Sequence, residues 1–420
     1  MSHFKALLKK KGTGPTMSKS LWGDDFIELE KGFKDEAISL TRKATMLTAL
    51  LTLEPNPEEK EWLSKVYGSP ETYLPSELVA FITKNNAPHP LFDFTIKAIQ
   101  HQDLTKEEST EAIKLVLHPE TPEYLKAAFM EAERLKRESF DENKAFLDVF
   151  WDSAQRIESD IPVIVDIANA YDGFNRNIFM GPFIAQALAS LGIHTVLHGV
   201  ESVAPKFGMN AHSFLTELNI PIPTSLEDAH DQLKTQGWTY VDQSVSFPEL
   251  HVLNQLRTNM VKRPVLATIE KFLHPIHSTS RHILITGYTH PAYKDMTSKL
   301  LSSANKAHEF VFFRGTEGSS QLSMDRRAPY VSGINGEISD GFVSPEDMGL
   351  NMYSKIEPEP TLTTKESLKR IKESLLAKQG LPYDILVYNA SIIKSLVDTQ
   401  PLSQEAVSTS LSESALALFK

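Results

Sequence analysis

The chain has 420 residues, of which 41% are hydrophobic and 23% charged, so its composition is that of a globular protein with two or three domains. It contains no cysteine, which excludes disulfides, thiolate metal sites and cysteine nucleophiles and fits a reducing compartment such as the cytoplasm. The net charge of −11 argues against a protein that coats nucleic acid with its whole surface, although a local basic groove is compatible with it.

Helix patterns run through the first part of the chain and predict a helical domain at residues 1–155. Apolar side chains recur at helical spacing between residues 106 and 137, where two prolines divide the stretch into two helices. Thr105 followed by Glu108 predicts a capping box at the start of the first of them. The residues near 4 and 20 show a weak internal similarity to those near 94 and 103, which two amphipathic helices alone would also produce. An extra or inserted helical segment near 20–95, which splits one helical module, is the alternative.

Beyond residue 155 the pattern changes to short apolar runs rich in β-branched residues, which alternate with helical stretches. We expect strands near residues 161–167, 194–199, 238–242, 281–288 and 308–314, and helices near 178–191, 209–218, 227–236, 249–272 and 293–305. This alternation predicts a mainly parallel sheet covered on both faces, so residues 156–420 should form an α/β domain. The helices near 249–272 are expected to pack with the helical domain, and a ligand cleft is expected between the two domains.

One uncharged run, from Ile178 to Val196, approaches the length of a membrane-spanning helix. Gly181 and Pro182 interrupt it, and Leu191-Gly192 is typical of a helix end. We therefore expect a buried helix followed by a buried strand, and no membrane segment.

The loop after the first strand of the predicted α/β domain, residues 166–177, is the first candidate site. It follows a strand and opens a helix, so free backbone N–H groups and the positive helix end suit a phosphate there. Asn175, Arg176 and Asn177 add donors. A turn in which Asn and Gly serve only backbone geometry is the alternative. The three-glycine spacing of a dinucleotide-binding loop is missing.

A second candidate segment, residues 198–210, follows the next predicted strand. His198-Gly199 ends this strand, where open α/β sheets place their ligands. Lys206 is placed to meet a phosphate as a point charge. A solvated surface lysine is the alternative.

Two further segments carry charged residues of the kinds that bind anions or metals. Arg257 and Arg263 lie six positions apart with Lys262 beside the second, and such a cluster suits a carboxylate or diphosphate unless it is merely exposed on a helix pair. Glu317 stands in a Gly-rich loop at the end of a predicted strand, where one carboxylate would bind Mg²⁺ weakly and a turn residue is the alternative.

Taken in order, these segments resemble the anthranilate phosphoribosyltransferase family, also called glycosyltransferase family 3. His198-Gly199, followed by Ser202-Val203 and Lys206-x-Gly208, is similar to the family's His-Gly-Asn-Arg-Ser-Val-Ser-Ser-Lys-x-Gly segment. The stretch 257–275 is similar to its Arg-Glu-Leu-Gly-x-Arg-Thr…Asn-Pro segment. The resemblance covers most of the chain.

The chain departs from the family at positions that carry the family's chemistry. Where the family's diphosphate loop reads Gly-Thr-Gly-Gly-Asp-Gly, residues 168–173 read Ala-Asn-Ala-Tyr-Asp-Gly, so only the last two persist. Ser319 and Ser320 stand where the family's Mg²⁺-binding Asp-Glu pair is expected, and Glu201 replaces the arginine of the His-Gly-Asn-Arg segment. The chain thus resembles a divergent branch of the family.

The resemblance implies a homodimer and a phosphoribosyl transfer, in which an aromatic amine displaces diphosphate from phosphoribosyl diphosphate, as in tryptophan biosynthesis. Asp172, Asn175 and Lys206 would face the sugar-phosphate and Arg257 the acceptor carboxylate. Mg²⁺ would bridge the diphosphate, held weakly through Glu317 or water. The candidate substrate-binding residues are Asp172, Gly173, Asn175, Arg176, His198, Lys206, Arg257 and Arg263.

Two other functions stay open. A homodimer of the same fold could bind a nucleotide or single-stranded nucleic acid without catalysis, and its cations should then converge on one groove. The candidate cations are Arg176, Lys206, Arg257, Lys262, Arg263, Arg314, Arg326 and Arg327. A dimeric scaffold with a vestigial site is the third interpretation.

Overall fold

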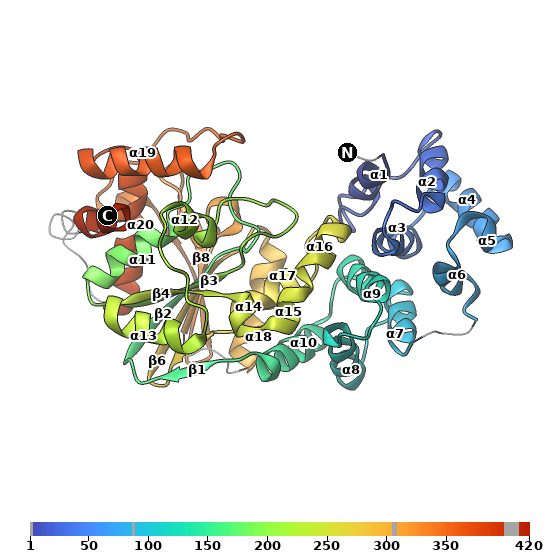
Figure 1. Ribbon diagram of the computed structural model, residues 1–420, viewed down its shortest axis with the longest axis horizontal. Coiled ribbons are helices and arrows are strands. Elements are labelled where there is room, and N and C mark those ends of the chain that lie inside the picture. The colour runs from blue at the N-terminus through green and yellow to red at the C-terminus, as the bar shows by residue number, and fades with distance from the viewer. Residues whose placement is uncertain (1–2, 86–88, 305–308, 399–410) are drawn as a thin grey trace. The chain divides into compact units, whose positions relative to one another are not determined.

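The computed structural model describes residues 3–85, 89–304, 309–398 and 411–420, which fall into two compact units (Figure 1). Unit 1 comprises Met1–Asp152 and Val252–Glu270. Unit 2 comprises Ser153–His251 and Lys271–Lys420. The chain therefore leaves unit 1, builds part of unit 2, and returns to unit 1 for one short segment.

Unit 1 is helical, as the helix patterns predict. Its helices are α1 (His3–Lys11), α2 (Asp25–Lys34), α3 (Leu40–Thr52), α4 (Pro57–Gly68), α5 (Pro70–Tyr73), α6 (Ser76–Thr83), α7 (Leu91–Ile99), α8 (Lys106–Leu117), α9 (Glu123–Lys136) and α10 (Phe140–Ser153). α9 is buried along most of its length, and its Leu135 packs with Ala49 and Leu53 at the end of α3. The capping box expected from Thr105 and Glu108 is confirmed at the start of α8.

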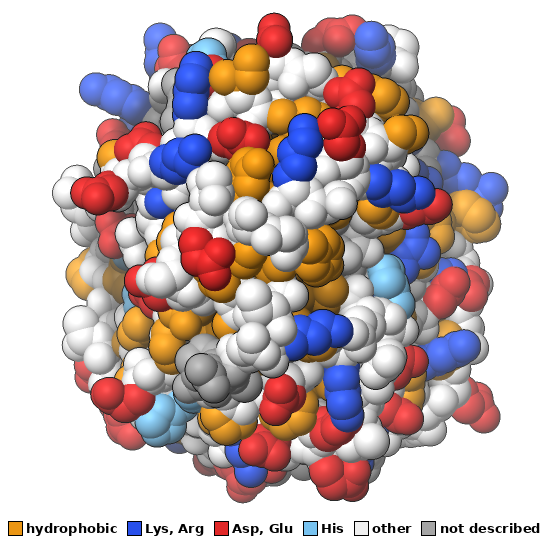
Figure 2. Space-filling model, turned by 90° about the vertical axis from the view of Figure 1, so that its right-hand side faces the viewer, with side chains coloured by type: hydrophobic (Ala, Val, Ile, Leu, Met, Phe, Trp, Pro, Cys, Tyr) orange, Lys and Arg blue, Asp and Glu red, His pale blue; other side chains and the backbone are white. Residues whose placement is uncertain are grey.

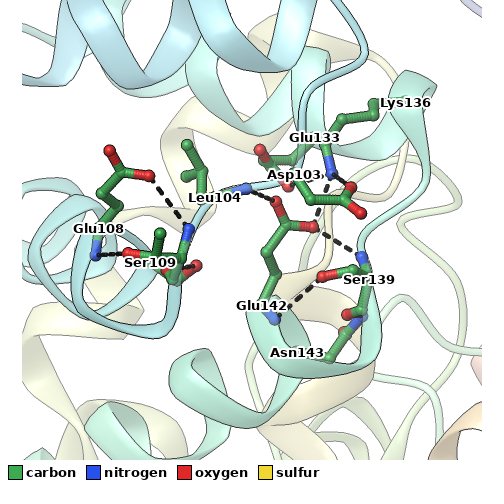
Figure 3. A network of polar contacts seen from close by, with 10 residues as sticks. Asp103, Leu104, Glu108, Ser109, Glu133, Lys136, Ser139, Glu142 and Asn143 are labelled. Atoms are coloured by element: carbon green, nitrogen blue, oxygen red, sulfur yellow. Dashed lines mark hydrogen bonds and ion pairs between the residues drawn. The ribbon is translucent and has the colours of Figure 1, made fainter.

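A buried polar network ties the segment before α8 to the end of α9 and the start of α10 (Figure 3). The Glu142 carboxylate accepts hydrogen bonds from the backbone N–H groups of Leu104, at 2.7 Å, and Ser139, at 2.6 Å. It also accepts one from Lys136 Nζ at 2.6 Å, and that ammonium pairs in addition with Asp103 at 2.9 Å. Because buried donors need partners, this network fixes how the three segments meet.

The helix expected near 249–272 is divided into short pieces. They are α15 (Pro248–Val252), α16 (Asn254–Met260), α17 (Leu266–Ile269) and the 3-10 helix η1 (Glu270–Phe272). α16 ends where Val261 takes a left-handed backbone conformation, with φ 67°, and Pro264 has no N–H for a continuing helix. Within unit 1, Arg42 of α3 donates to the Asn259 carbonyl of α16 at 3.4 Å.

Unit 2 is built on a seven-stranded sheet with the order β4-β3-β2-β6-β7-β8-β9. The strands are β2 (Val163–Ala168), β3 (His194–Gly199), β4 (Trp238–Asp242), β6 (Arg281–Gly287), β7 (Glu309–Phe313), β8 (Ala328–Ile334) and β9 (Glu337–Val343). Neighbours from β4 to β7 are parallel, and β8 and β9 are antiparallel. The mainly parallel sheet that the sequence predicts is thus confirmed. A separate parallel pair joins β1 (Ile157–Ser159) to β5 (Ile276–Ser278).

Helices cover both faces of this sheet (Figure 1). On one face Val165 and Ile167 of β2 pack in a core formed with α11 (Gly181–Ser190), α12 (Ala211–Glu217), α19 (Thr364–Ala377) and α20 (Leu381–Asp398). On the other face Ile164 and Val196 pack against α13 (Leu226–Gln236). The remaining elements are α14 (Gln243–Ser246), α18 (Pro291–Ala304), η2 (Thr316–Gly318), η3 (Pro345–Met348) and η4 (Leu416–Phe419). Side chains alternate along a strand, so Asp166 shares the face of Ile164.

The uncharged run from Ile178 to Val196 forms α11 and the start of β3, as expected. Among the residues that the structure describes, no helix has both the length and the apolar character needed to cross a membrane.

Candidate functional site

The parallel strands of unit 2 bring several loops to one edge of the sheet. The loops after β2, β3, β6 and β7 begin at residues 169, 200, 288 and 314. Because these four strands run parallel and are neighbours, their carboxyl ends meet at the same edge, where open α/β sheets bind ligands. The candidate segments near Asp172, His198, Lys206 and Glu317 therefore belong to one edge of one unit.

The loop after β2 is held by backbone contacts with the loop after β3. Phe174 N–H donates to the Met209 carbonyl at 2.8 Å, and Met209 N–H donates back to the Phe174 carbonyl at 2.7 Å. Gly173 has a φ of 75°, and a Cβ there would lie 2.5 Å from the Met209 carbonyl oxygen, so a side chain has no room. Asp172, which precedes it, is buried. This fixed turn sets the direction of the N–H groups that follow.

We call residues 173–177 together with Lys206 the anion loop, because their donors converge on the carboxylate of Glu317 in η2. The backbone N–H groups of Asn175 and Arg176 donate to it at 3.3 and 3.0 Å, and Asn177 Nδ2 donates at 3.1 Å. Lys206 Nζ forms an ion pair with the same carboxylate at 3.1 Å. Convergent backbone N–H groups are typical of anion sites, and here the anion is a side chain of the protein itself.

The surroundings of Glu317 keep its carboxylate ionised. Burial alone would raise the pKa of Glu317, but the charge of Lys206 and hydrogen bonds from Asn177, Lys206 and Asn175 outweigh it and lower that pKa below its usual value. Glu317 has a φ of 53°, a left-handed conformation that costs a non-glycine residue on the order of 1 kcal/mol. The backbone of Glu317 is therefore strained in this conformation, and the hydrogen bonds and ion pair to its carboxylate offset the cost of that strain.

The arrangement around Glu317 does not fit a magnesium ion. Mg²⁺ needs oxygen ligands in octahedral geometry, whereas both Glu317 oxygens already accept from protein donors and one lies 3.1 Å from the Lys206 ammonium. Ser319 Oγ donates to the Thr316 carbonyl at 2.7 Å, and Ser320 Oγ donates to Asn169 Oδ1 at 2.9 Å. The weak metal ligation expected of Glu317 is replaced here by a hydrogen-bonded carboxylate.

An open groove of about 650 Å³ lies beside the anion loop, within unit 2. Its lining includes Phe174 and Asn175 from the anion loop, Gly208 from the loop after β3, and residues between 360 and 364. Two exposed carboxylates, those of Glu201 and Glu217, also line it. A ligand seated in the anion loop could extend into this groove.

His198 lies in a buried cluster of polar side chains on the α13 face of the sheet. Its Nδ1 is hydrogen-bonded to the Tyr171 hydroxyl, and its Nε2 lies 3.0 Å from Asp166 Oδ1. The other oxygen, Asp166 Oδ2, lies 2.8 Å from His274 Nδ1 and 3.5 Å from His282 Nε2. Three imidazoles therefore surround one carboxylate.

Charge within this cluster is concentrated on Asp166. Burial alone would raise the pKa of the Asp166 carboxyl, but the charge of His198 and hydrogen bonds from His198, His274 and His282 outweigh it and hold that pKa well below its usual range. Burial, with His282 adding to it, lowers the pKa of His274 to about 3 against the opposing effect of Asp166. The cluster thus holds an ionised carboxylate beside a neutral imidazole.

Arg257 and Arg263 belong to unit 1, whereas the anion loop belongs to unit 2. Arg257 is 1% exposed, and its Nη1 pairs with Glu270 at 2.9 Å, so its guanidinium is engaged inside unit 1. Arg263 is exposed. Lys262 donates to Thr13 Oγ1 at 3.2 Å. The cations considered for nucleic acid are therefore divided between the two units, and Lys206 and Arg257 are already paired with carboxylates.

Sequence reasoning selected His198 but missed the residues around it. His274 precedes Pro275 in the segment compared with the family, and His282 lies inside a strand that was expected to be buried. A histidine within a buried strand needs a polar partner, and that requirement was the available signal. Tyr171 was noticed only as a departure from the family's loop.

Comparison with known proteins agrees with this architecture. The helical bundle domain of the glycosyl transferase family matches residues 93–154. The chain is 24% identical over 269 residues to an uncharacterized protein of Aquifex aeolicus, covering 64% of this chain and 80% of that one. It is 23% identical over 339 residues to the anthranilate phosphoribosyltransferase of Ralstonia pickettii, covering 76% and 94%.

A solved structure gives the same picture. The anthranilate phosphoribosyltransferase from Saccharomyces cerevisiae in complex with PRPP and Mg superposes with a TM-score of 0.61 at 15% identity, covering 78% of this chain and 96% of that one. The chain has the fold of these transferases. Its resemblance to an anthranilate phosphoribosyltransferase-like family is supported at low identity, so it is a divergent relative.

Proposed function

We propose that this chain is a phosphoribosyltransferase that binds phosphoribosyl diphosphate at the anion loop and transfers its phosphoribosyl group to an aromatic amine. The convergence of Asn175, Arg176, Asn177 and Lys206 on one carboxylate is the observation that carries the proposal. A diphosphate offers the same kind of acceptor oxygens with more charge, so it can displace the carboxylate of Glu317. The PRPP complex of the yeast relative supports this class of ligand.

The proposed reaction needs no nucleophilic side chain. The amine attacks the anomeric carbon while the bond to diphosphate breaks, and positive charge develops on the sugar. Diphosphate leaves with the bonding electron pair, and the amine nitrogen loses one proton to solvent. Catalysis then consists of positioning the reactants and stabilising charge. Lys206 and the N–H groups of Asn175 and Arg176 hold the departing diphosphate. No step is assigned to Mg²⁺ or to Arg257, because Ser319 and Ser320 stand where the family's metal-binding acidic pair is expected, and Arg257 is paired with Glu270.

The groove beside the anion loop supports a choice of acceptor. Glu201 and Glu217 line it and are exposed, so a second anion placed there would meet like charge. The groove therefore favours an aromatic amine that carries no carboxylate, in contrast to anthranilate.

Calorimetry on the full chain tests the proposal, with phosphoribosyl diphosphate as the ligand in the presence and in the absence of Mg²⁺. We expect saturable binding that inorganic diphosphate competes away. Release of diphosphate is then followed with a panel of aromatic amines, with and without a carboxylate. No binding at millimolar ligand would refute the proposal, and binding without diphosphate release for any amine would limit it to ligand binding.

A homodimer is part of the same proposal, by analogy with the family, and light scattering coupled to size exclusion measures it. Figure 2 shows hydrophobic side chains exposed among charges of both signs. Exposed large apolar residues of unit 1 include Trp22, Ile27 and Tyr67, which are 53%, 55% and 55% exposed. Such side chains are candidates for a subunit contact.

Binding of single-stranded nucleic acid is the competing outcome. Filter binding across a range of salt concentrations distinguishes it, because retention with a steep salt dependence requires several phosphate contacts. If single-stranded nucleic acid is not retained on the filter, nucleic-acid binding is excluded and the phosphoribosyl ligand is the remaining candidate for the anion loop.

A further inference from the structure

We propose that Asp166, His274 and His282 bind one divalent transition-metal ion of the zinc class inside unit 2, at a site separate from the anion loop. One ligand atom from each residue faces the other two. Asp166 Oδ2 lies 2.8 Å from His274 Nδ1 and 3.5 Å from His282 Nε2, and the two nitrogens are 3.0 Å apart.

These separations match the spacing of ligands around a small metal ion. Bonds of about 2.0–2.1 Å from zinc to nitrogen or oxygen, at tetrahedral angles, place ligand atoms about 3.3 Å apart. Three atoms within 2.8 to 3.5 Å of one another can therefore share one ion with small side-chain adjustments.

The fold holds the three residues independently of any ligand. β2 and β6 are parallel neighbours, and His282 stands opposite Ile164, two residues before Asp166, so both side chains project from the same face of the sheet. His274 comes from the segment between η1 and β5. Asp166 and His274 are 0% exposed and His282 is 3% exposed, so water does not compete for the ligand atoms.

Protons satisfy this triangle of atoms less well than a cation. A proton on His274 Nδ1 must then serve both the Asp166 oxygen, at 2.8 Å, and His282 Nε2, at 3.0 Å, while the His282 lone pair also lies 3.5 Å from the carboxylate oxygen. Protons on both nitrogens instead bring two N–H groups together at 3.0 Å. A divalent cation accepts all three lone pairs at once, and it neutralises a carboxylate that is otherwise buried among imidazoles.

The remaining members of the cluster are placed to orient the carboxylate. His198 Nε2 lies 3.0 Å from Asp166 Oδ1, the carboxylate oxygen that is not one of the three proposed ligand atoms. Tyr171 is hydrogen-bonded to His198 Nδ1. Partners that orient a ligating carboxylate or imidazole are usual around metal sites. In this assignment His198 and Tyr171 are positioning residues and do not bind the ion.

The donor set selects the kind of metal. Two imidazole nitrogens disfavour Mg²⁺ and Ca²⁺, which take oxygen ligands, and the chain has no thiolate to attract soft metals. Zn²⁺ suits two imidazoles and a carboxylate, and Co²⁺ adopts the same geometry with a visible spectrum. Because the site is closed to solvent, the ion enters during folding and ties β2, β6 and the segment before β5 together.

The metal content of the full chain, produced in zinc-supplemented medium without a histidine tag, is the first measurement. We expect about one zinc per chain. The wild-type chain is then denatured with a chelator and refolded with Zn²⁺, with Co²⁺ or without metal. Refolding with Co²⁺ should give visible absorption bands, and refolding without metal should lower the melting temperature.

Variants locate the ion. Asp166→Asn and His282→Gln should lower the zinc content at least about tenfold. His277→Gln changes a nearby histidine, whose ring centre is 6.3 Å from that of His282, and should retain the metal. Metal retained in full by folded Asp166→Asn and His282→Gln would overturn the assignment. If these variants do not fold, the wild type decides, and a wild-type chain that takes up neither Zn²⁺ nor Co²⁺ on expression or refolding would overturn it equally.

Discussion

At the scale of single residues, Glu317 decides how readily the anion loop takes an external ligand. Its carboxylate occupies the donors that a phosphate would use, so an incoming anion must first displace it. Glu317→Gln keeps the shape and removes the charge that competes. We expect the affinity for inorganic diphosphate to rise roughly tenfold, about 1.4 kcal/mol, in calorimetry. The exposed Glu337→Gln is the control, and equal affinity in all three proteins would contradict a site shared by Glu317 and the ligand.

For Lys206, at the same site, we predict the opposite effect, since its removal should weaken ligand binding. Its ammonium bridges the Gly173 carbonyl, at 2.8 Å, and Glu317, so it both orders the anion loop and adds charge. Lys206→Ala should weaken binding of phosphoribosyl diphosphate by roughly tenfold or more, about 1.5–3 kcal/mol. Lys234→Ala, which removes a lysine from the surface of α13, should leave the affinity unchanged. Unaltered affinity in Lys206→Ala, with the wild type binding, would show that the ligand sits elsewhere.

Glu133 gives a pH-dependent prediction for unit 1. It is fully buried, and neither of its oxygens has a hydrogen-bond partner among the described residues. Burial, together with the nearby charge of Glu142, raises the pKa of Glu133 well above its usual value, despite Lys136 at 3.6 Å. The folded chain then keeps a proton that the unfolded chain releases above pH 4.5, so this residue lowers stability as pH rises from there.

Glu133→Gln removes that proton linkage. Relative to the wild type, its free energy of unfolding should increase with pH by up to about 1.4 kcal/mol per unit above pH 4.5 until the pKa of Glu133 in the folded protein is passed. Urea denaturation between pH 5 and pH 8 measures the difference. Parallel curves for the two proteins would contradict a raised pKa at this position.

At the scale of elements, the sequence predicts those helices and strands that have a clear pattern of apolar residues. Every expected strand is present because each is a buried apolar run, and the Thr105 cap is present because its partner Glu108 stands at the required spacing. The hairpin of β8 and β9 escaped prediction because β9 is largely exposed and has no apolar run. The broken helix near 249–272 depends on a left-handed residue at Val261, which no apolar pattern reveals.

The candidate site was predictable to a similar extent. The anion loop was predictable because it follows a parallel strand, and the order of strands and helices can be read from the sequence. The pairing of Lys206 with Glu317 joins residues 111 apart, and that of His274 with Asp166 joins residues 108 apart, so tertiary packing alone creates them. Sequence therefore identified the donors of the anion loop and, separately, Glu317, but not that these donors hold the Glu317 carboxylate.

Arg281 of β6 links this strand to β7 and α20, and we predict that its replacement by lysine destabilises unit 2. Its Nε and Nη2 donate to the two oxygens of Glu309 on β7, at 2.6 and 2.8 Å, and its Nη1 donates to the carbonyl of Val397 in α20 at 2.7 Å. A lysine cannot reproduce this fork, so Arg281→Lys should lose about 1–3 kcal/mol of stability. Urea denaturation measures it, with the exposed Arg326→Lys as control. Equal stability of Arg281→Lys and wild type would mean that the fork contributes little.

At the scale of the whole molecule, the division into units separates the proposed activities. Every donor of the anion loop, and Glu317, belongs to unit 2, whereas Arg257 and Arg263 belong to unit 1. Unit 2 also has its own sheet with apolar cores on both faces. A chain of roughly 250 residues can bury enough surface to fold by itself. Unit 2 is therefore expected to hold a phosphate ligand without unit 1.

A chain that lacks residues 1–152, with Val252–Glu270 replaced by a Gly-Ser linker of equal length, tests this expectation. It should bind inorganic diphosphate with an affinity within about threefold of that of the full chain. The loss of even one charge-assisted hydrogen bond to the ligand would lower the affinity by more, roughly tenfold. Calorimetry gives the affinity, and circular dichroism with thermal melting establishes that the shortened chain is folded. A folded chain that has lost diphosphate binding would show that unit 1 supplies part of the anion site. Glu317→Gln in the shortened chain should raise its affinity as it does in the full chain, because the displaced carboxylate and all of its donors are still present.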